Sequence, residues 1–400
     1  MSRTLFLSVS PGEIWAALAE DDELVGLRLL RTGAPSRVGE IYLGRIAALR
    51  PELPAALVDL GFDRPAFLDA RDADRRTGIT GLTEGQAVIV EIVKEARDDK
   101  AAGVRVLRAN DRRRPNLEIL ASKVKAPARL AQPEPPIAAV IMQFLDPLPA
   151  RIVIDDRAAF AEARGFLARR NPDAVIELVV HAEPTPVFEA AGVQVDIDTA
   201  LASLVALPGG GTLHIETTYA ATVIDVDSGK DSGLAANLEA AQQVARQILL
   251  RNIAGPVVID FVGIEKRSDR EAVQAALKTA LASDPEKADV LGWTRLGHME
   301  LVRKRRHAPL GDILYERAPD GTRRKSAITL ALEALRAVAR EAAAQPGRAL
   351  MLIVHPEIAA ALDDGEGEAV RRMLETRLGR PLVVEARASG AREAFDIRPA

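Results

Sequence analysis

Short runs of apolar residues, alternating with polar ones, predict strands in the first quarter of the chain. Between residues 39 and 108 five such runs are joined by turns rich in Gly, Pro and Asp. They cover residues 40–49, 54–61, 64–70, 86–96 and 103–109. Five short strands in one span are typical of an OB-type β-barrel, which we therefore expect here.

From residue 151 onward strand-like and helix-like patterns alternate, which predicts an α/β architecture with a mixed or mainly parallel sheet. The expected strands include residues 151–156, 174–180, 211–217, 221–227, 256–262 and 288–294, and the expected helices include 158–170, 237–252 and 270–283. Residues 323–400 repeat the alternation as a separate small α/β domain. Residues 110–149 show no sustained period and are predicted to be a linker or a partly ordered arm.

Composition narrows the chemistry. Four hundred residues predict two or three lobes, and the absence of cysteine excludes disulfides, thiol catalysis and any cysteine-based zinc site. Hard cations held by carboxylates remain the natural metal candidates. No apolar stretch is long enough to span a membrane, and the start of the chain lacks the pattern of a signal peptide. We therefore predict a cytoplasmic protein without a membrane span.

The formal net charge of −4 argues mildly against nucleic-acid binding, but basic residues are concentrated locally. One basic segment covers residues 104–130, and a second run covers residues 303–306, shortly after Arg295. Each is either a solvated surface or part of a track for phosphate groups. The second interpretation makes Arg303 a candidate RNA contact.

The predicted barrel carries three of the chain's few aromatic residues. Tyr42, Phe62 and Phe67 are candidates for stacking on bases, with Arg45 and Lys100 near them in the pattern. Packing in the barrel core is the alternative interpretation for each ring.

Two predicted strands end in aspartate. Period-two alternation places Asp225 and Asp227 on one face at the end of the first strand, and Asp260 ends the next strand after a helix of crossover length. If the strands are neighbours, these carboxylates converge at one sheet edge and suit Mg²⁺, which polarises phosphodiesters. The alternative is that each is a turn or helix-capping residue. The five histidines are scattered and are interpreted as structural or surface residues.

At these positions the chain resembles the catalytic half of the bacterial ribonuclease E/G family. The resemblance runs in order through GGGTLHIETTYAATVIDVDSG, NLEAAQQVARQILLRNIAGPVVIDFVGI and TRLGHMELVRKRR, and the earlier segments VGEIYLGRI, PAALVDLGFDRPAFL and LTEGQAVIVEIVKE are similar to the family's S1-type OB domain.

The resemblance implies an α/β multidomain fold with RNase H-like and DNase I-like catalytic subdomains, an inserted S1-type OB barrel and a small C-terminal α/β domain. The implied division is 1–36 for the first part of the RNase H-like subdomain, 37–109 for the S1-like domain, 110–146 for a basic linker or reduced sensor region, 147–203 for the second RNase H-like part, 204–306 for the DNase I-like subdomain, 307–322 for a linker and 323–400 for the C-terminal domain.

Carried over by position, the family's motifs make Asp225 and Asp260 the ligands of catalytic Mg²⁺. Asp227 matches an active-site Asn that helps to orient the metal site and the scissile phosphate. Arg295 matches an arginine beside the catalytic face, and Phe67 and Lys100 match RNA contacts of the S1 surface.

The chain also departs from the family pattern. Asp227 in place of Asn cannot donate a hydrogen bond and adds negative charge, so it is either a third metal ligand or a handicap for phosphate binding. Leu57 replaces an aromatic of the S1 face, and Gly263 replaces a second acid. The sensor for 5′-monophosphate and the cysteine zinc link have no counterpart.

The leading hypothesis from the sequence is a Mg²⁺-dependent endoribonuclease that cuts single-stranded RNA to 3′-hydroxyl and 5′-phosphate ends, in RNA processing or turnover. It would neither sense the 5′ end nor form zinc-bridged dimers, which leaves a homo-oligomer without zinc bridging open. The alternatives are a catalytically weak RNA-binding scaffold with the same fold, and a different metal-dependent phosphohydrolase.

Overall fold

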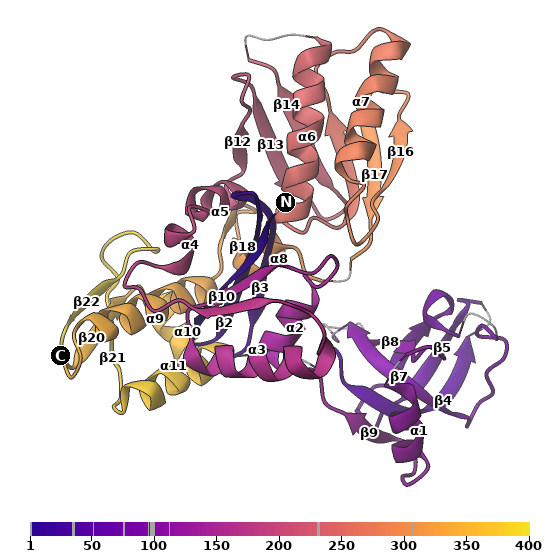
Figure 1. The fold of residues 1–400 in the computed structure, drawn as a ribbon, viewed down its shortest axis with the longest axis horizontal. Helices are drawn as coiled ribbons and strands as arrows, with labels where there is room; N and C mark the ends of the chain where they lie inside the picture. The colour runs from indigo at the N-terminus through magenta and orange to yellow at the C-terminus, as the bar shows by residue number, and fades with distance from the viewer. Residues whose placement is uncertain are drawn as a thin grey trace. The chain divides into compact units, whose positions relative to one another are not determined.

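The computed structural model describes the chain except for residues 1, 34–36, 51, 75–76, 95, 97–100, 112, 230–232 and 306. The chain divides into two compact units. One unit combines Met1–Ala34 with Pro136–Ala400, and the other is Pro35–Pro135. Figure 1 shows the elements of both. No described helix is both long and apolar enough to cross a membrane.

The unit of residues 35–135 is a closed five-stranded barrel. Its strands are β4 (Ile41–Arg50), β5 (Ala55–Asp59), β6 (Ala66–Asp69), β7 (Ala87–Lys94) and β8 (Gly103–Val106), in the order β5-β6-β8-β7-β4, and β4 pairs back with β5. The short 3₁₀-helix η1 (Ala70–Asp72) follows β6. Inward positions such as Ile46, Val58 and Val90 form the core, and at Gly44 a Cβ would lie 2.5 Å from Val58 Cγ1. The barrel predicted from the alternating pattern is confirmed.

The range 110–146, which the sequence predicts as a linker, holds regular elements. They are α1 (Arg114–Ala121), β9 (Ala128–Ala131) and α2 (Pro136–Met142). β9 pairs with β4 as a sixth strand beside the barrel, and Leu117 of α1 packs on Ile41. These contacts are long-range in sequence, which is why a short periodic pattern could not reveal them.

Strands from two distant segments build the first sheet of the larger unit. Its strands are β1 (Arg3–Ser10), β2 (Glu13–Glu20), β3 (Glu23–Arg31), β10 (Arg151–Ile154) and β11 (Glu177–Val180), in the order β11-β10-β1-β2-β3. One face packs against α2 and α3 (Arg157–Arg170), and the other packs against α4 (Val187–Ala190), α5 (Gln194–Leu201) and α8 (Leu310–Leu314). The chain therefore leaves this sheet after β3 and returns to it at β10.

A second, six-stranded mixed sheet carries helices on one face (Figure 1). Its strands are β12 (Leu204–Ala206), β13 (Thr212–Thr217), β14 (Thr222–Asp227), β15 (Gly255–Asp260), β16 (Asp289–Trp293) and β17 (Met299–Arg303), in the order β12-β13-β14-β15-β17-β16. Helices α6 (Leu234–Leu250) and α7 (Arg267–Ala280) bury apolar side chains against it. Only β14 and β15 run parallel, and α6 forms the crossover between them.

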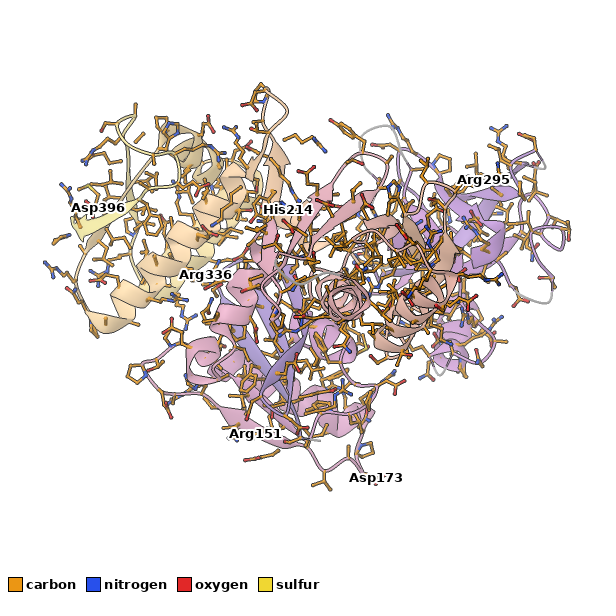
Figure 2. All side chains as sticks on the ribbon, turned by 90° about the horizontal axis from the view of Figure 1, so that it is seen from above. Arg151, Asp173, His214, Arg295, Arg336 and Asp396 are labelled. Atoms are coloured by element: carbon orange, nitrogen blue, oxygen red, sulfur yellow. The ribbon has the colours of Figure 1, made fainter. Side chains whose placement is uncertain are left out.

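The last segment folds as a hairpin and a small α/β lobe. Its elements are β18 (Tyr315–Arg317), β19 (Arg323–Lys325), α9 (Ala327–Ala344), β20 (Leu350–Val354), α10 (Pro356–Leu362), α11 (Gly365–Leu378), β21 (Val383–Ala386) and β22 (Asp396–Pro399). The lobe has its own apolar core. It is tied to the first sheet where Arg336 of α9, labelled in Figure 2, donates to Glu13 Oε2 at 2.7 Å. The mixed α/β architecture predicted from residue 151 onward is therefore confirmed for the described residues.

Candidate functional site

The two aspartates predicted from the strand ends lie side by side. β14 and β15 pair in parallel with Asp225 in register with Asp260. Neighbouring strands are about 4.8 Å apart, so two carboxylates in register lie within reach of one ion. Both side chains are exposed, and that of Asp260 is 55% accessible. The crossover through α6 thus brings together two residues that are 35 positions apart.

The alternation along β14 decides which face these carboxylates occupy. Ile224 and Val226 are buried in the core shared with α6 and α7, while Asp225 and Asp227 are exposed. The acidic residues therefore lie on the sheet face that points away from the two helices. A carboxylate in water keeps its charge without the desolvation cost of burial, which suits a site for a hydrated cation.

Asp227 has a local partner. Its Oδ1 accepts a hydrogen bond at 2.8 Å from the backbone N–H of Gly229, an arrangement typical of an Asx turn. Among the residues that the structure describes, no three His, Cys, Asp or Glu side chains form a group suited to a metal ion. The geometry therefore contains a carboxylate pair, with Asp227 engaged in the turn that follows.

Two histidines flank the pair, and the sequence did not single them out. His214 of β13 is in register with Asp225, and His298 Nε2 lies 3.7 Å from Asp260 Oδ1. The row is His214 on β13, Asp225 on β14, Asp260 on β15 and His298 immediately before β17. Period-two alternation in the sequence indicates which face of a strand each histidine occupies. It does not indicate that these strands are neighbours, because the strand order is a property of the fold.

Arg295 lies in the turn that joins β16 and β17, and its side chain is exposed (Figure 2). Thr294 shapes this turn, because its Oγ1 accepts hydrogen bonds from the N–H groups of Leu296 and His298. The same turn therefore carries Arg295 and delivers His298 to Asp260. A cationic side chain on the turn adjoining the carboxylate pair suits an anionic substrate.

A buried amide fixes the backbone just after Asp260. Asn237 of α6 is fully buried, and its Nδ2 donates to the carbonyl of Val262 at 2.8 Å. The N–H of Val262 donates to Asn237 Oδ1 at 3.1 Å. These two bonds hold the exit of β15 against the helix, so Asn237 is a positioning residue that the sequence pattern did not reveal.

Arg303 requires a correction. The sequence interpretation makes it an RNA contact, but its side chain is 1% exposed, and Nε and Nη2 each donate at 2.9 Å to the carboxylate of Asp284. Its Nη1 donates to Asn252 Oδ1 and to the carbonyl of Ile253. All three nitrogens have protein partners, so Arg303 is an internal cross-link at the foot of β17. Arg306 lies outside the described residues.

The barrel residues divide between surface and interior. Phe67 is 36% exposed and Arg45 is exposed, so both are open to a ligand. Arg45 already donates to the carbonyls of Gly85 and Ala126. Leu57, where the family pattern has an aromatic, is in register with Phe67. Lys100 lies outside the described residues.

Tyr42 is the second correction. Its ring is 7% exposed, and its hydroxyl donates to Glu40 Oε2 at 2.8 Å. Burial and this hydrogen bond raise the pKa of Tyr42 to about 12. Phe62 packs edge-on against Tyr42 at 5.4 Å between ring centroids, and the Arg37 guanidinium lies 4.1 Å from the Phe62 centroid. The burial of Tyr42 favours core packing over RNA stacking.

Comparison with known proteins finds ribonucleases that are similar to this chain along most of its length. Ribonuclease G of Haemophilus influenzae is 26% identical over 484 aligned positions, with 98% of each chain covered, and ribonuclease G of Salmonella typhimurium is 26% identical, with 99% of each chain covered. Ribonuclease E of Haemophilus influenzae is 26% identical over 92% of this chain, which corresponds to 49% of that protein. The model of the Ribonuclease E/G family matches residues 84–306, more than half of the 400 residues. The chain belongs to the ribonuclease E/G family.

Proposed function

We propose that this protein is a Mg²⁺-dependent endoribonuclease that cleaves single-stranded RNA in RNA processing or turnover. The observation that carries the proposal is the register pairing of Asp225 with Asp260 on an exposed sheet face, in a member of a ribonuclease family. The relatives are named ribonuclease G and ribonuclease E, which supports RNA as the substrate.

The carboxylate pair fits Mg²⁺ by its donor chemistry. This ion takes one or two carboxylates and keeps several waters, and the pair is open to solvent on the helix-free face. Asp225 and Asp260 would hold it. Bound there, Mg²⁺ supplies charge neutralisation and lowers the pKa of water for attack on a phosphodiester.

The chain's own groups would act on the RNA as follows. Arg295 on its turn attracts and orients the scissile phosphate, and His298 beside Asp260 orients that carboxylate. Water attacks phosphorus and the bond from phosphorus to the 3′ oxygen breaks. The phosphate stays on the 5′ end of the downstream product, and the departing 3′ oxygen takes a proton from solvent to become a hydroxyl.

The barrel supplies a second surface for RNA in this proposal. We interpret it as an S1-type OB domain on which Phe67 stacks with a base and Arg45 attracts the backbone. The two larger sheets are interpreted as the RNase H-like and DNase I-like subdomains. The domain boundaries drawn from the sequence, the homo-oligomer and the cytoplasmic location stay predictions.

The chain is shorter than the family pattern. Its 400 residues are covered to 98% by an alignment of 484 positions, so the relative contains segments with no counterpart here. This difference supports the proposal that the 5′-monophosphate sensor is missing. Comparable cleavage of 5′-hydroxyl and 5′-monophosphorylated RNA is expected, and a marked preference for the 5′-monophosphate would contradict it.

The carboxylate pair is tested on unstructured RNA labelled at one end, with Mg²⁺ and with EDTA. Asp225→Asn and Asp260→Asn should each lower the rate about a hundredfold or more, because each removes a charged donor, and EDTA should abolish cleavage. Asp289→Asn is the matched control, since Asp289 is an exposed strand residue of the same sheet outside the pair. Parent-like cleavage by both pair variants would overturn the assignment.

An RNA-binding scaffold with weak catalysis is the second candidate. Asp227 favours it, because a carboxylate in place of an amide repels the phosphate that it would face. Restoring the amide with Asp227→Asn distinguishes the two candidates. A large gain in cleavage rate would indicate a handicapped enzyme, whereas RNA binding without cleavage in both forms would support the scaffold.

A further inference from the structure

A polar cavity lies within the larger unit, away from the carboxylate pair. It has a volume of about 710 Å³ and is enclosed by the end of α5, the ends of β13 and β14, α8 and the β18–β19 hairpin. We call it the arginine pocket, because it is lined by Arg251, Arg305, Arg317 and Arg323. Its acidic lining residues are Glu216 and Asp312, so its formal charge is +2 in a chain whose net charge is −4.

The β18–β19 hairpin places two of these positive charges next to each other, which is unfavourable when no anion is bound. Arg317 and Arg323 are directly opposite each other across β18 and β19, and both line the pocket. Like charges in directly opposed positions destabilise a two-stranded ribbon. Partial burial and, to a smaller extent, the nearby charge of Arg317 lower the pKa of Arg323, while Tyr315 and Asp312 act in the opposite direction. An anion between the two guanidinium groups would remove this repulsion.

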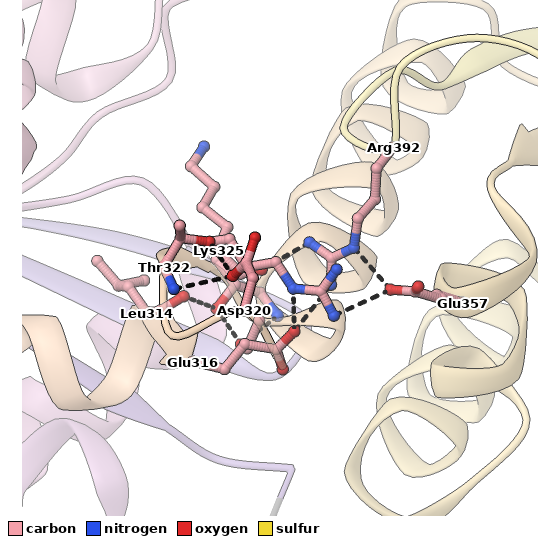
Figure 3. Close-up of polar contacts among 10 residues, drawn as sticks. Leu314, Glu316, Asp320, Thr322, Lys325, Glu357 and Arg392 are labelled. Carbon is pink, nitrogen blue, oxygen red and sulfur yellow. Dashed lines mark hydrogen bonds and ion pairs between the residues drawn. The ribbon is translucent and has the colours of Figure 1, made fainter. Parts of the chain in front are cut away.

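The opposite face of the hairpin is neutralised within the protein. Glu316 is in register with Arg324, and its Oε1 accepts a hydrogen bond from Arg324 Nε at 3.0 Å. Arg392 donates to the same carboxylate at 3.0 Å and to Glu357 at 2.7 Å, which ties the hairpin to the C-terminal lobe (Figure 3). One face of the hairpin therefore carries satisfied charges, and the other presents two arginines with no carboxylate within 4.0 Å among the described residues.

Arg251 adds a third unneutralised cation from the end of α6. Its Nε donates to Gln247 Oε1 at 2.9 Å and its Nη2 donates to the carbonyl of Thr199, both uncharged partners. Burial and the nearby charge of Arg323 lower the pKa of Arg251 to about 10. Among the described residues this partly buried guanidinium has only neutral acceptors, so a charge-assisted hydrogen bond to an anion would be favourable.

Glycine and tyrosine hold Arg323 in place. A Cβ at Gly311 would lie 1.8 Å from Arg323 Nη2, so the guanidinium occupies space that any other residue would fill. The guanidinium carbon lies 4.8 Å from the Tyr315 ring centroid, and the Tyr315 hydroxyl donates to the carbonyl of Leu201. Arg323 is thus in contact with Gly311 and Tyr315 at the pocket wall, although the residue as a whole is exposed.

We propose that the arginine pocket binds a small phosphorylated ligand of nucleotide size, such as a nucleoside diphosphate. The volume matches pockets for small ligands, which range from about 300 to 1,000 Å³. Arg251, Arg317 and Arg323 would bind the phosphates, and the apolar lining that includes Ile215, Ile253 and Leu310 would cover the base. The pocket lies at the ends of the strands opposite to the carboxylate pair, and its ligand is independent of the proposed cleavage activity.

Calorimetric titration of the full-length protein in EDTA tests this proposal, because EDTA removes metal from the carboxylate pair. ADP and GDP are the probes, with inorganic phosphate, adenosine and guanosine beside them. One nucleotide should bind per chain, phosphate should bind more weakly, and the nucleosides should not bind. No binding of either diphosphate would overturn the proposal.

Substitutions locate the binding site. Arg317→Gln and Arg323→Gln should each weaken nucleotide binding about tenfold or more, because each removes a charge-assisted hydrogen bond. Arg267→Gln is the matched control, since it removes the same charge from an arginine whose side chain is 92% exposed on α7. Equal weakening in the control, or unchanged binding in the Arg317→Gln, Arg323→Gln double variant, would contradict the proposal.

Gly311→Ala provides a variant that leaves every charge in place. Its methyl group must displace the Arg323 guanidinium, so nucleotide binding should weaken while the circular dichroism spectrum stays that of the parent. A 5′-phosphorylated oligonucleotide tests whether the pocket binds the phosphate of RNA instead of a small phosphorylated ligand. If it binds in an Arg323-dependent manner and both diphosphates do not, the pocket is a groove for RNA and the small-ligand proposal is wrong.

Discussion

At the scale of single residues, burial separates arginines that the sequence treats alike. Arg295 and Arg303 are eight positions apart, and both were interpreted as functional residues, the first beside the catalytic face and the second as an RNA contact. Yet one is exposed in a turn and the other is enclosed by Asp284, Asn252 and Ile253. Nothing local distinguishes them, because the partner of Arg303 comes from a different part of the chain. Tyr42 and Phe67 of the barrel differ in the same way.

The buried pair of Arg303 and Asp284 leads to a stability prediction. Arg303→Ala should lower the free energy of unfolding by about 3–5 kcal/mol, because it leaves Asp284 as an uncompensated buried charge. Urea denaturation measures the change, with Arg267→Ala as the exposed control. The RNA affinity of the remaining folded protein should be unchanged. A stable Arg303→Ala variant with weakened RNA binding would instead support the interpretation of Arg303 as an RNA contact.

At the scale of elements, the parallel pairing of β14 and β15 is what makes the site. Apolar residues alternating with Asp225 and Asp227 predicted the first strand, and the crossover length of the following helix was compatible with a neighbouring strand that ends in Asp260. The structure shows that the two strands are neighbours. The antiparallel neighbours β13 and β17 could not be predicted in the same way. They bring His214 and His298 to the pair, and their order depends on packing across the whole sheet.

The attachment of α6 to the end of β15 gives a prediction at this scale. Asn237→Ala leaves the N–H and the carbonyl of Val262 without their buried partners, at a cost of about 1–3 kcal/mol for each group. Both the free energy of unfolding and the cleavage rate should fall. Gln242→Ala, at an exposed position of the same helix, is the control. An unchanged unfolding transition for Asn237→Ala would show that the two bonds do not hold this junction.

At the scale of the whole molecule, the first sheet of the larger unit is built from strands that lie before and after the barrel unit of residues 35–135 in the sequence. Strand β1 pairs with β10 although their first partners, Thr4 and Arg151, are 147 positions apart in the sequence. Asp155 reinforces this junction, because its carboxylate accepts from Ser8 Oγ at 2.8 Å and from the N–H of Val9 at 2.7 Å.

Asp155 also predicts a dependence of stability on pH. Burial raises its pKa in the folded protein. A carboxyl with a raised folded pKa contributes its full stability below the unfolded pKa of about 3.9, and this contribution is lost as the pH rises through the folded pKa. Asp155→Asn cannot ionise, so the stability of the parent relative to this variant should fall between pH 3.5 and pH 7. Unfolding transitions at the two pH values measure it, and a parent that gains relative stability with pH would contradict the assignment.

Local sequence patterns predicted the barrel strands, the alternation of strands and helices after residue 151, and the aspartates at two strand ends, but not α1, β9 and α2. Period-two alternation predicted the barrel strands and the faces of β14 and β15, since side-chain direction along a strand depends only on local geometry. The tertiary structure alone decided which distant groups meet. It paired Asp260 with His298, enclosed Arg303 with Asp284, and brought Arg251 to the hairpin that carries Arg317 and Arg323. Strand order and helix packing depend on the total apolar surface that the whole chain buries, and a local sequence pattern does not give this total.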